Sequence, residues 1–335
     1  MRLGFLGVGW IGRNRLEAVA RSGVGEIAAI ADPSRADAAA ARSAAPRARL
    51  YERYEDLLRE DLDGVVIATP SAMHAAQAIM ALERGLAVFC QKPLGRSAVE
   101  TRRVVDAARA ADRLLGVDLS YRAVEGVRRM GEFCHSGRLG RLFTADLVFH
   151  NAYGPDKDWF YDRRRSGGGC VMDLGIHLVD LALWFFGHPR VERIQSRLFA
   201  GGEPLPRRPQ AVEDYAVATL HLEGGGVARL ACSWRLSAGR EAVIEASVYG
   251  TEGAVTLRNV NGSFYDFVAE HCVGTRREIL AKPPDPWGGR AIVEWATRVA
   301  GGARFDPSAE RLVTTAEVLD AIYGRRSSAR QPALA

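Results

Sequence analysis

Short apolar runs alternate with helical patterns over the first 120 residues. Strand-like runs occupy Leu3–Leu6, Glu26–Ala31, Gly64–Ala68, Ala87–Cys90 and Leu114–Val117. Between these runs, apolar residues recur at helical spacing over 11–22, 35–45, 53–60, 73–84 and 97–111. This alternation predicts βαβ units, and βαβ units in series predict a parallel sheet.

From residue 121 onward the pattern changes. A helical stretch at 122–136 precedes a long strand at 141–153. Period-two alternation then recurs at 191–200, 214–222, 227–236, 241–249, 254–260 and 264–273. The run Glu223-Gly224-Gly225-Gly226 predicts a hairpin turn between two of these strands. The second half is therefore expected to be an α+β domain with a large, mostly antiparallel open sheet.

Helical periodicity returns at 288–300 and 308–324, and we expect these helices to pack back on the body of the protein. The tail from 325 to 335 lacks a core-forming pattern and is expected to fray. The predicted domains are thus 1–120, an α/β domain with a parallel sheet, and 121–335, the sheet domain.

Composition excludes several classes of function. The chain has 335 residues, 47% hydrophobic and 25% charged, as a globular protein of two domains does. The formal charge of +5 is small, and the tight basic runs, 163–165 and 325–326, are too short for a nucleic-acid surface. Five scattered cysteines without a CxxC pair argue against a disulfide framework and a structural zinc site.

The N-terminus lacks a secretory signal pattern, and the most apolar stretch, 170–187, contains Asp173, His177 and Asp180. We therefore expect neither a membrane span nor export, and predict a cytoplasmic protein.

A glycine-rich motif follows the first strand directly and opens a helix. It comprises Gly7, Gly9 and Gly12, with Trp10 and Ile11 between the last two. In this context the glycines allow a tight turn, close approach of a pyrophosphate, and packing of helix on strand. The motif predicts a Rossmann domain that binds a dinucleotide at the start of the helix.

Asp32 ends the second strand, about twenty residues beyond the motif, where a carboxylate accepts the ribose hydroxyls of NAD. A 2′-phosphate would meet like charge there, so NAD is favoured. Arg35 leaves NADP open, because its guanidinium could contact that phosphate.

Two further strand ends carry polar side chains at the edge where ligands bind in open α/β sheets. Thr69 and Pro70 follow the third strand and precede His74, which is equally well explained as a helix-start packing or capping residue. Gln91-Lys92-Pro93 follows the fourth strand. The ammonium of Lys92 could stabilise developing alkoxide charge on a substrate, or be an ordinary solvated lysine.

Three glycines, 167–169, lead into an apolar helical pattern that carries Asp173 and His177. Residues four apart share one helix face, so the carboxylate could orient the imidazole as a general base. A capping aspartate with a buried histidine is the structural alternative. A zinc site would need a third ligand at suitable spacing, so no metal is expected.

Four motifs in this order resemble those of the Gfo/Idh/MocA oxidoreductase family. They are the glycine motif, Thr69-Pro70 with His74, Lys92-Pro93, and the glycines followed by Asp173 and His177. The resemblance covers essentially the whole chain. It implies an NAD(P)-binding Rossmann domain, a sheet domain that lines the substrate site, and homodimers or homotetramers built through the open sheet. It also implies catalytic roles for Lys92, Asp173 and His177.

One residue departs from the family pattern. The family usually has Glu before the Lys-Pro pair, whereas this chain has Gln91, which can still accept from a nicotinamide-ribose hydroxyl but carries no charge. Tyr121, Arg122, Tyr153 and Trp159 are candidate substrate contacts, although core packing explains these aromatics equally well.

The expected activity is hydride transfer between NAD(P) and a secondary alcohol or ketone carbon of a sugar, amino sugar or cyclitol. Two alternatives are a glycosidase that uses NAD for transient oxidation and a regulatory protein that binds NAD without turnover. The Lys92, Asp173 and His177 set argues against the regulatory protein.

Overall fold

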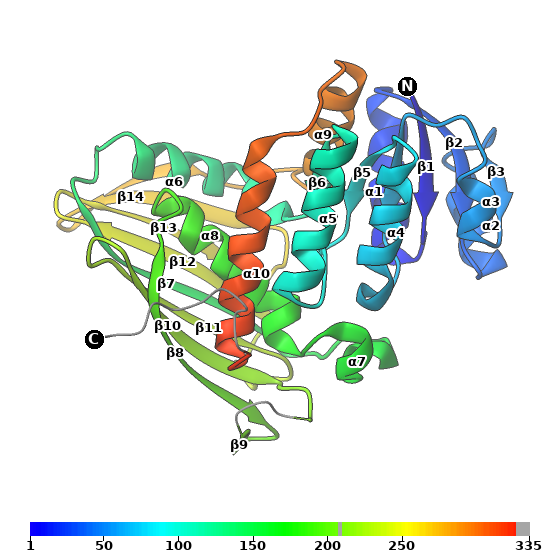
Figure 1. Cartoon of the computed structure of the whole chain (residues 1–335). Helices are drawn as coiled ribbons and strands as arrows, with labels where there is room; N and C mark the ends of the chain where they lie inside the picture. Colours follow the sequence, from blue (N-terminus) through cyan, green and yellow to red (C-terminus); the bar gives the residue numbers. More distant parts are fainter. Residues whose placement is uncertain (207–209, 326–335) are drawn as a thin grey trace. The chain divides into compact units, whose positions relative to one another are not determined.

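The computed structural model describes residues 1–206 and 210–325 and divides the chain into two compact units (Figure 1). The first unit comprises residues 1–124 and 286–312. The second comprises 125–285 and continues from 313. The segment 286–312 therefore belongs to the first unit although it follows the second in sequence. The tail expected to fray, apart from residue 325, lies outside the described residues.

The first unit is built on a six-stranded parallel sheet in the order β3-β2-β1-β4-β5-β6. The strands are β1 (Arg2–Leu6), β2 (Glu26–Ala31), β3 (Arg49–Tyr51), β4 (Gly64–Ile67), β5 (Ala87–Cys90) and β6 (Leu115–Val117). Five of these match the apolar runs of the sequence. The three-residue edge strand β3 is unexpected, because it pairs only with β2 and has no buried side chain to give an apolar run.

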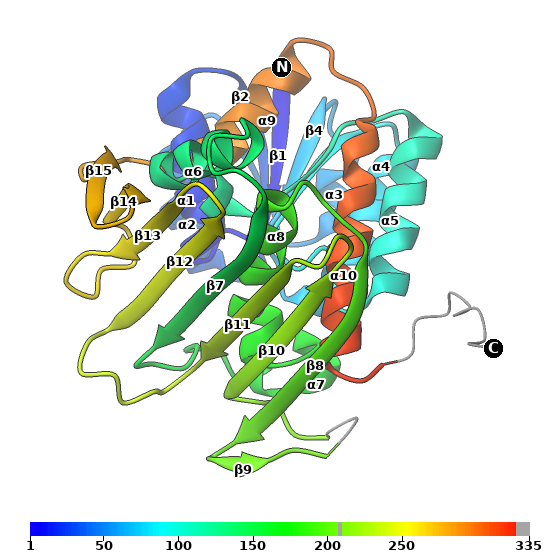
Figure 2. The same cartoon turned by 90° about the vertical axis from the view of Figure 1, so that its left-hand side faces the viewer.

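Helices cover both faces of this sheet (Figure 2). They are α1 (Trp10–Ser22), α2 (Arg35–Arg42), α3 (Tyr54–Leu57), α4 (Ser71–Glu83), α5 (Ala98–Ala111) and α9 (Arg290–Ala300). Serine side chains cap two of them: Ser34 accepts from the Asp37 amide and Ser97 from the Glu100 amide. A short 3₁₀ turn, Ser120–Ala123, follows β6.

The core between α1, α9 and the sheet is closed by one residue from the distant segment. Trp295 of α9 is 4% exposed, and its ring centroid lies 5.6 Å from that of Phe89. A Cβ at Gly64 or Gly116 would lie 2.9 or 2.7 Å from the indole. The two strand glycines therefore make the space that the indole fills.

The second unit is built on a nine-stranded sheet in the order β15-β14-β13-β12-β7-β11-β10-β8-β9. The strands are β7 (Leu142–Asn151), β8 (Val191–Ala200), β9 (Glu203–Pro204), β10 (Tyr215–Leu222), β11 (Val227–Ser233), β12 (Ala242–Gly250), β13 (Ala254–Asn259), β14 (Phe267–Val273) and β15 (Arg276–Ala281). The predicted hairpin joins β10 and β11, and only the β7–β11 pair is parallel among the described strands of this nine-stranded sheet. The predicted fold class is confirmed, with β9 and β15 as additional edge strands.

One face of this sheet is covered by the unit's own helices. They are α6 (Glu125–His135), α7 (Arg163–Ser166), α8 (Ile176–Phe185) and the part of α10 (Glu310–Ile322) that belongs to this unit. Alternate residues of β7 (Ala145, Leu147 and Phe149) are buried, and those between them are partly exposed. Figure 2 shows the strands in front of α8, with no helix of the described residues on the near face.

One described helical segment, 163–185, has the length and apolar composition of a membrane span. In this fold 89% of its most apolar window is buried inside the protein. A buried core helix passes the same test of length and composition, so this segment is weak evidence for a membrane.

Candidate active site

The glycine loop connects β1 to α1 in a space too small for side chains. Gly7 has φ +78°, which favours glycine, and a Cβ there would lie 2.6 Å from the carbonyl oxygen of Ala68. A Cβ at Gly12 would lie 2.0 Å from the carbonyl oxygen of Gly7. The protein's own packing therefore requires both glycines.

Gly9 is different. Its φ of −58° suits any residue, and an added Cβ would meet nothing within 4 Å. Neither its φ angle nor packing among the described residues requires glycine at this position. A ligand that needs close approach to the backbone does require it, as the pyrophosphate of a dinucleotide does. The residues present therefore fit such a cofactor. Trp10, next to it, is 65% exposed, and Ile11 is partly buried.

Asp32 lies directly after β2 and is 8% exposed. Its Oδ2 accepts from the Val8 amide at 2.7 Å, and its Oδ1 accepts from the Ser34 amide at 2.8 Å. Each carboxylate oxygen has a second lone pair, so Asp32 holds the loop and can still accept from a ribose hydroxyl. Arg35 is paired with Glu52, with Nη2 2.7 Å from the carboxylate.

His74 is buried in α4 and joins two loops at the carboxyl edge of the sheet. Its Nδ1 lies 2.7 Å from the carbonyl oxygen of Pro93 and its Nε2 2.6 Å from that of Thr69. Burial lowers the pKa of His74, and the two carbonyl contacts partly oppose this. The imidazole is engaged by backbone on both sides, so its direct role is to hold the segment after Lys92. A cofactor contact from His74 stays a prediction.

Lys92 follows β5, is partly buried, and precedes a cis peptide bond to Pro93. Gln91, before it, is buried and donates from Nε2 to Oδ2 of Asp118, the residue after β6. Arg15 of α1 donates from Nε to the same oxygen at 2.6 Å. Sequence reasoning missed Asp118 and Arg15, which lie 103 positions apart.

The segment that carries Asp173 and His177 is not the regular helix expected. Val171–Gly175 forms a π-helix, a wider turn often found at functional sites, and α8 starts at Ile176. His177 is 6% exposed. Asp173 accepts on Oδ2 from the indole Nε1 of Trp234 at 3.0 Å. Trp234 was not expected from the sequence, and it fixes one oxygen of the carboxylate.

A buried glutamate holds the start of this segment. Glu213, 1% exposed, accepts on Oε1 from the amides of Gly169 and Val171 at 2.9 and 3.0 Å and from the Tyr323 hydroxyl at 2.7 Å. Burial raises the pKa of Glu213, and these hydrogen bonds oppose the rise in part. A Cβ at Gly169 would lie 1.9 Å from the carbonyl oxygen of Glu213, so this glycine permits the approach.

The four candidate substrate residues lie in different environments. Tyr121 is 8% exposed and packs against Trp287 in the first unit, with ring centroids 5.4 Å apart, so its ring serves the core. Arg122 follows it and is partly buried. In the second unit, Tyr153 is 55% exposed, and Trp159 stacks on Phe160 at 3.8 Å. Tyr153 therefore has the most exposed ring of the three aromatics.

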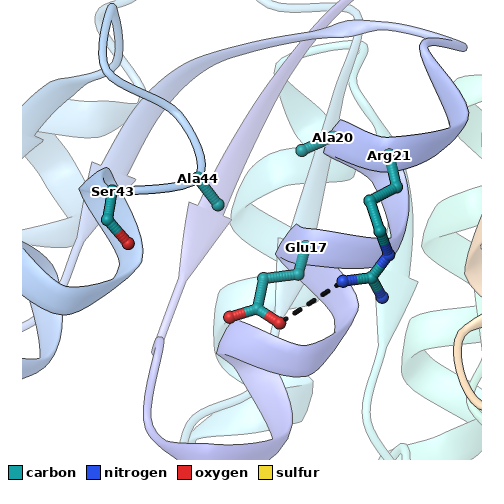
Figure 3. A pocket seen from close by; sticks show the side chains of 5 residues that line it. All are labelled: Glu17, Ala20, Arg21, Ser43 and Ala44. Atoms are coloured by element: carbon teal, nitrogen blue, oxygen red, sulfur yellow. Dashed lines mark ion pairs between the residues drawn. The ribbon is translucent and has the colours of Figure 1, made fainter.

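Two negative observations concern the described residues. No group of three or more His, Cys, Asp or Glu side chains in them is arranged to hold a metal ion. An open surface pocket along the second half of α1 contains none of the predicted site residues (Figure 3). It is lined by Glu17, Ala20, Arg21, Ser43 and Ala44, and a 3.5 Å ion pair joins Glu17 to Arg21.

Replacing Glu213 separates the effect of its hydrogen bonds from that of its charge. Glu213→Ala leaves three buried donors unsatisfied and is expected to lower the free energy of unfolding by about 3–5 kcal/mol. Glu213→Gln keeps an acceptor and is expected to lower it less. Denaturant unfolding measures both. Equal losses for the two variants would contradict the assignment.

The charge of Glu213 makes the stability of the protein depend on pH. Because the pKa of Glu213 is raised in the folded state, the unfolded chain loses this proton first as the pH rises above the ordinary value of 4.5. The contribution of the protonated carboxyl to stability is therefore lost as the pH rises. We expect the stability of the wild type relative to Glu213→Gln to fall as the pH rises above about 5. A difference that stays constant would contradict the raised pKa.

Comparison with known families gives two adjacent matches. Residues 1–119 match the oxidoreductase family with an NAD-binding Rossmann fold. Residues 127–256 match the GFO/IDH/MocA C-terminal domain. The two matches follow the two parts of the chain in the order expected from the sequence.

Individual relatives support the same family assignment. D-xylose 1-dehydrogenase (NADP(+)) 2 of Haloferax volcanii is 30% identical over 331 residues, 96% of each chain. D-glucoside 3-dehydrogenase of Escherichia coli is 27% identical over 212 residues, and the match spans only 60% of that protein's length and 60% of this chain. Levoglucosan dehydrogenase in complex with NADH and L-sorbose shares the fold, with a TM-score of 0.82 at 22% identity, over 97% of this chain and 96% of that one. The chain thus belongs to the Gfo/Idh/MocA family of NAD(P)-binding oxidoreductases.

Proposed function

We propose that the chain is a dehydrogenase or reductase that acts on a secondary alcohol or ketone carbon of a sugar, amino sugar or cyclitol. One observation carries this proposal: the first unit combines a glycine cradle, open at Gly9, with Lys92 at the carboxyl edge of the same parallel sheet. Ligands of open α/β sheets bind at that edge, so a lysine there can reach a substrate that sits beside the cofactor.

Each catalytic residue has a distinct task. Lys92 donates a hydrogen bond to the substrate oxygen and stabilises negative charge that develops on it. His177 accepts the hydroxyl proton in the oxidative direction, because a neutral imidazole is a suitable base near neutral pH. Asp173, held by Trp234, orients that imidazole. The nicotinamide of the bound cofactor supplies the hydride chemistry.

The cofactor residues are Gly7, Gly9 and Gly12 with Trp10 and Ile11 for the pyrophosphate, Asp32 for the adenine ribose, and Thr69, His74, Gln91 and Lys92 toward the nicotinamide half. We favour NAD over NADP. The carboxylate of Asp32 accepts ribose hydroxyls and repels a 2′-phosphate. Arg35, the side chain that could bind that phosphate, is neutralised by Glu52.

The substrate class is supported by the relatives, whose names include a glucoside dehydrogenase, a xylose dehydrogenase and an inositol dehydrogenase. Tyr153, Trp159, Tyr121 and Arg122 remain candidate substrate contacts. We further propose a cytoplasmic homodimer or homotetramer joined through the helix-free face of the nine-stranded sheet. Val217 and Tyr249 on that face are 37% and 36% exposed, which supports burial in an interface.

A pair of glycine variants tests the cofactor site. Gly9→Ala adds a methyl group that nothing in the chain obstructs, so the melting temperature should stay within about 2 °C of wild type. Binding of NADH should weaken about tenfold or more, because the methyl group occupies the approach of the pyrophosphate. Gly12→Ala should instead lower the melting temperature, because its methyl group meets the Gly7 carbonyl oxygen. Unchanged NADH binding by a folded Gly9→Ala protein would contradict the assignment.

The catalytic roles are tested by Lys92→Met and His177→Asn. Each should lower kcat by about 10²-fold or more and leave the Kd for NADH within about threefold, since the lost interactions concern the reacting oxygen. Absorbance of NADH across a panel of sugars and polyols measures turnover. Lys282→Met is the matched control, because Lys282 also precedes a proline but is exposed. Near-normal kcat in both site variants would refute the mechanism.

Cofactor preference is tested through the partner of Arg35. Glu52→Gln removes the charge that neutralises the guanidinium, so the kcat/KM ratio of NADP to NAD should rise, by about three- to fivefold for an exposed pair. Glu55→Gln, which breaks the neighbouring ion pair with Arg53, is the control and should leave the ratio unchanged. A ratio that is already above one in the wild type would show that NADP is the preferred cofactor.

A further inference from the structure

A buried polar cluster of Arg15, Gln91 and Asp118 joins three elements of the first unit. The three residues are 5%, 8% and 1% exposed. Arg15 belongs to α1, Gln91 follows β5, and Asp118 follows β6. Both donors bind one carboxylate oxygen, Oδ2 of Asp118, with the Arg15 Nε at 2.6 Å. The cluster links the helix of the glycine loop to the strand end that carries Lys92.

This contact determines the orientation of the Gln91 amide. A carboxylate accepts hydrogen bonds only, so the amide nitrogen must face Asp118 and the amide oxygen Oε1 must point away from it. If the amide were reversed, its oxygen would face a buried carboxylate oxygen with no proton between them. Gln91 therefore presents an acceptor in a fixed direction, as one oxygen of a glutamate would.

Charge explains why this chain tolerates glutamine at position 91. The guanidinium of Arg15 balances the carboxylate of Asp118, and a neutral amide adds nothing to that balance. A glutamate at this position would place a second carboxylate within hydrogen-bond distance of the first, in a site that excludes water. The glutamine that departs from the family pattern is thus the residue that a buried Asp118 requires.

We propose that Asp118 is a positioning residue for the cofactor. It holds the Gln91 amide so that Oε1 accepts from a hydroxyl of the nicotinamide ribose, next to Lys92. The negative charge that the family usually places at residue 91 is carried here by Asp118, one strand further along the sheet. This inference rests on the proposed function, because it assumes that Gln91 borders the nicotinamide half of the cofactor.

Substitutions of Asp118 and Gln91 test the proposal through cofactor binding. Asp118→Ala removes the acceptor, so Gln91 loses its fixed orientation and the Kd for NADH should rise about five- to tenfold. Asp118→Asn keeps an oxygen at the shared acceptor position, because the Arg15 Nε can only donate and holds that oxygen toward itself. Gln91 can still donate to this oxygen, so the Kd should stay within about threefold of wild type. Gln91→Glu sets two carboxylates against each other and should raise the Kd about tenfold at about pH 8.

Tryptophan fluorescence measures NADH binding in the intact protein without turnover. Asp106→Asn, at an exposed position of α5, is the matched control and should leave the Kd unchanged. If Asp118 were merely the structural partner of Arg15, Asp118→Ala would lower the melting temperature but bind NADH normally well below it. That result, or an Asp118→Asn protein that binds NADH as weakly as Asp118→Ala, would overturn the proposal. Failure of the Lys92 and His177 variants to lose turnover would refute the catalytic assignment and leave these NADH-binding measurements unaffected.

Discussion

The close approach of Gly12 to the carbonyl of Gly7 constrains the whole first unit. Because no side chain fits between them, α1 starts directly beyond the end of β1 and runs tightly against the sheet. Its first turn then lies at the carboxyl edge, with its backbone amides available to an anion. One turn further along, Arg15 reaches the end of β6 and pairs with Asp118. The same constraint thus places the phosphate cradle and anchors the strand end that carries Lys92.

In the second unit, a buried carboxyl group holds the segment that carries the candidate catalytic residues. The segment that carries Asp173 and His177 begins in a glycine run and a π turn, neither of which holds its shape by regular helical hydrogen bonds alone. Glu213 supplies the missing acceptor, and Trp234, the residue after β11, fixes Asp173. Both units therefore use an acidic side chain with very little solvent exposure to hold backbone or side chains in place near the residues assigned to chemistry.

The local pattern of apolar and polar residues was sufficient to predict most of the fold. Strands such as β2 and β5 are continuous apolar runs, and their limits match the sequence because every buried position is apolar. The edge strands β3, β9 and β15 were missed because their side chains are largely exposed and their pairing depends on a neighbour, not on their own composition. The π turn was missed because a five-residue widening leaves helical periodicity nearly intact.

The residues of the candidate site likewise fall into those that the sequence predicted and those that it did not. Gly9, Asp32, Lys92 and His177 were predicted because each lies in a recognisable order along the chain. Asp118, Glu213 and Trp234 were not, because each acts on a partner 27 to 61 positions away and has no local signature. Residues proposed to contact a ligand belong to sequence motifs in this chain, whereas the residues that hold them in place are visible only once the chain is folded.

Trp295 has a consequence for how the protein is made. The indole that fills the space above Gly64 and Gly116 is encoded far beyond the last strand of its own sheet. A ribosome adding about 5–20 residues per second completes β6 roughly 10 to 35 s before it adds this tryptophan. During that interval the cofactor domain has all its strands but an open core, and the sheet of the second domain is synthesised in full. The nucleotide-binding unit is encoded first, but its core can therefore close only after a late segment of the chain has been synthesised.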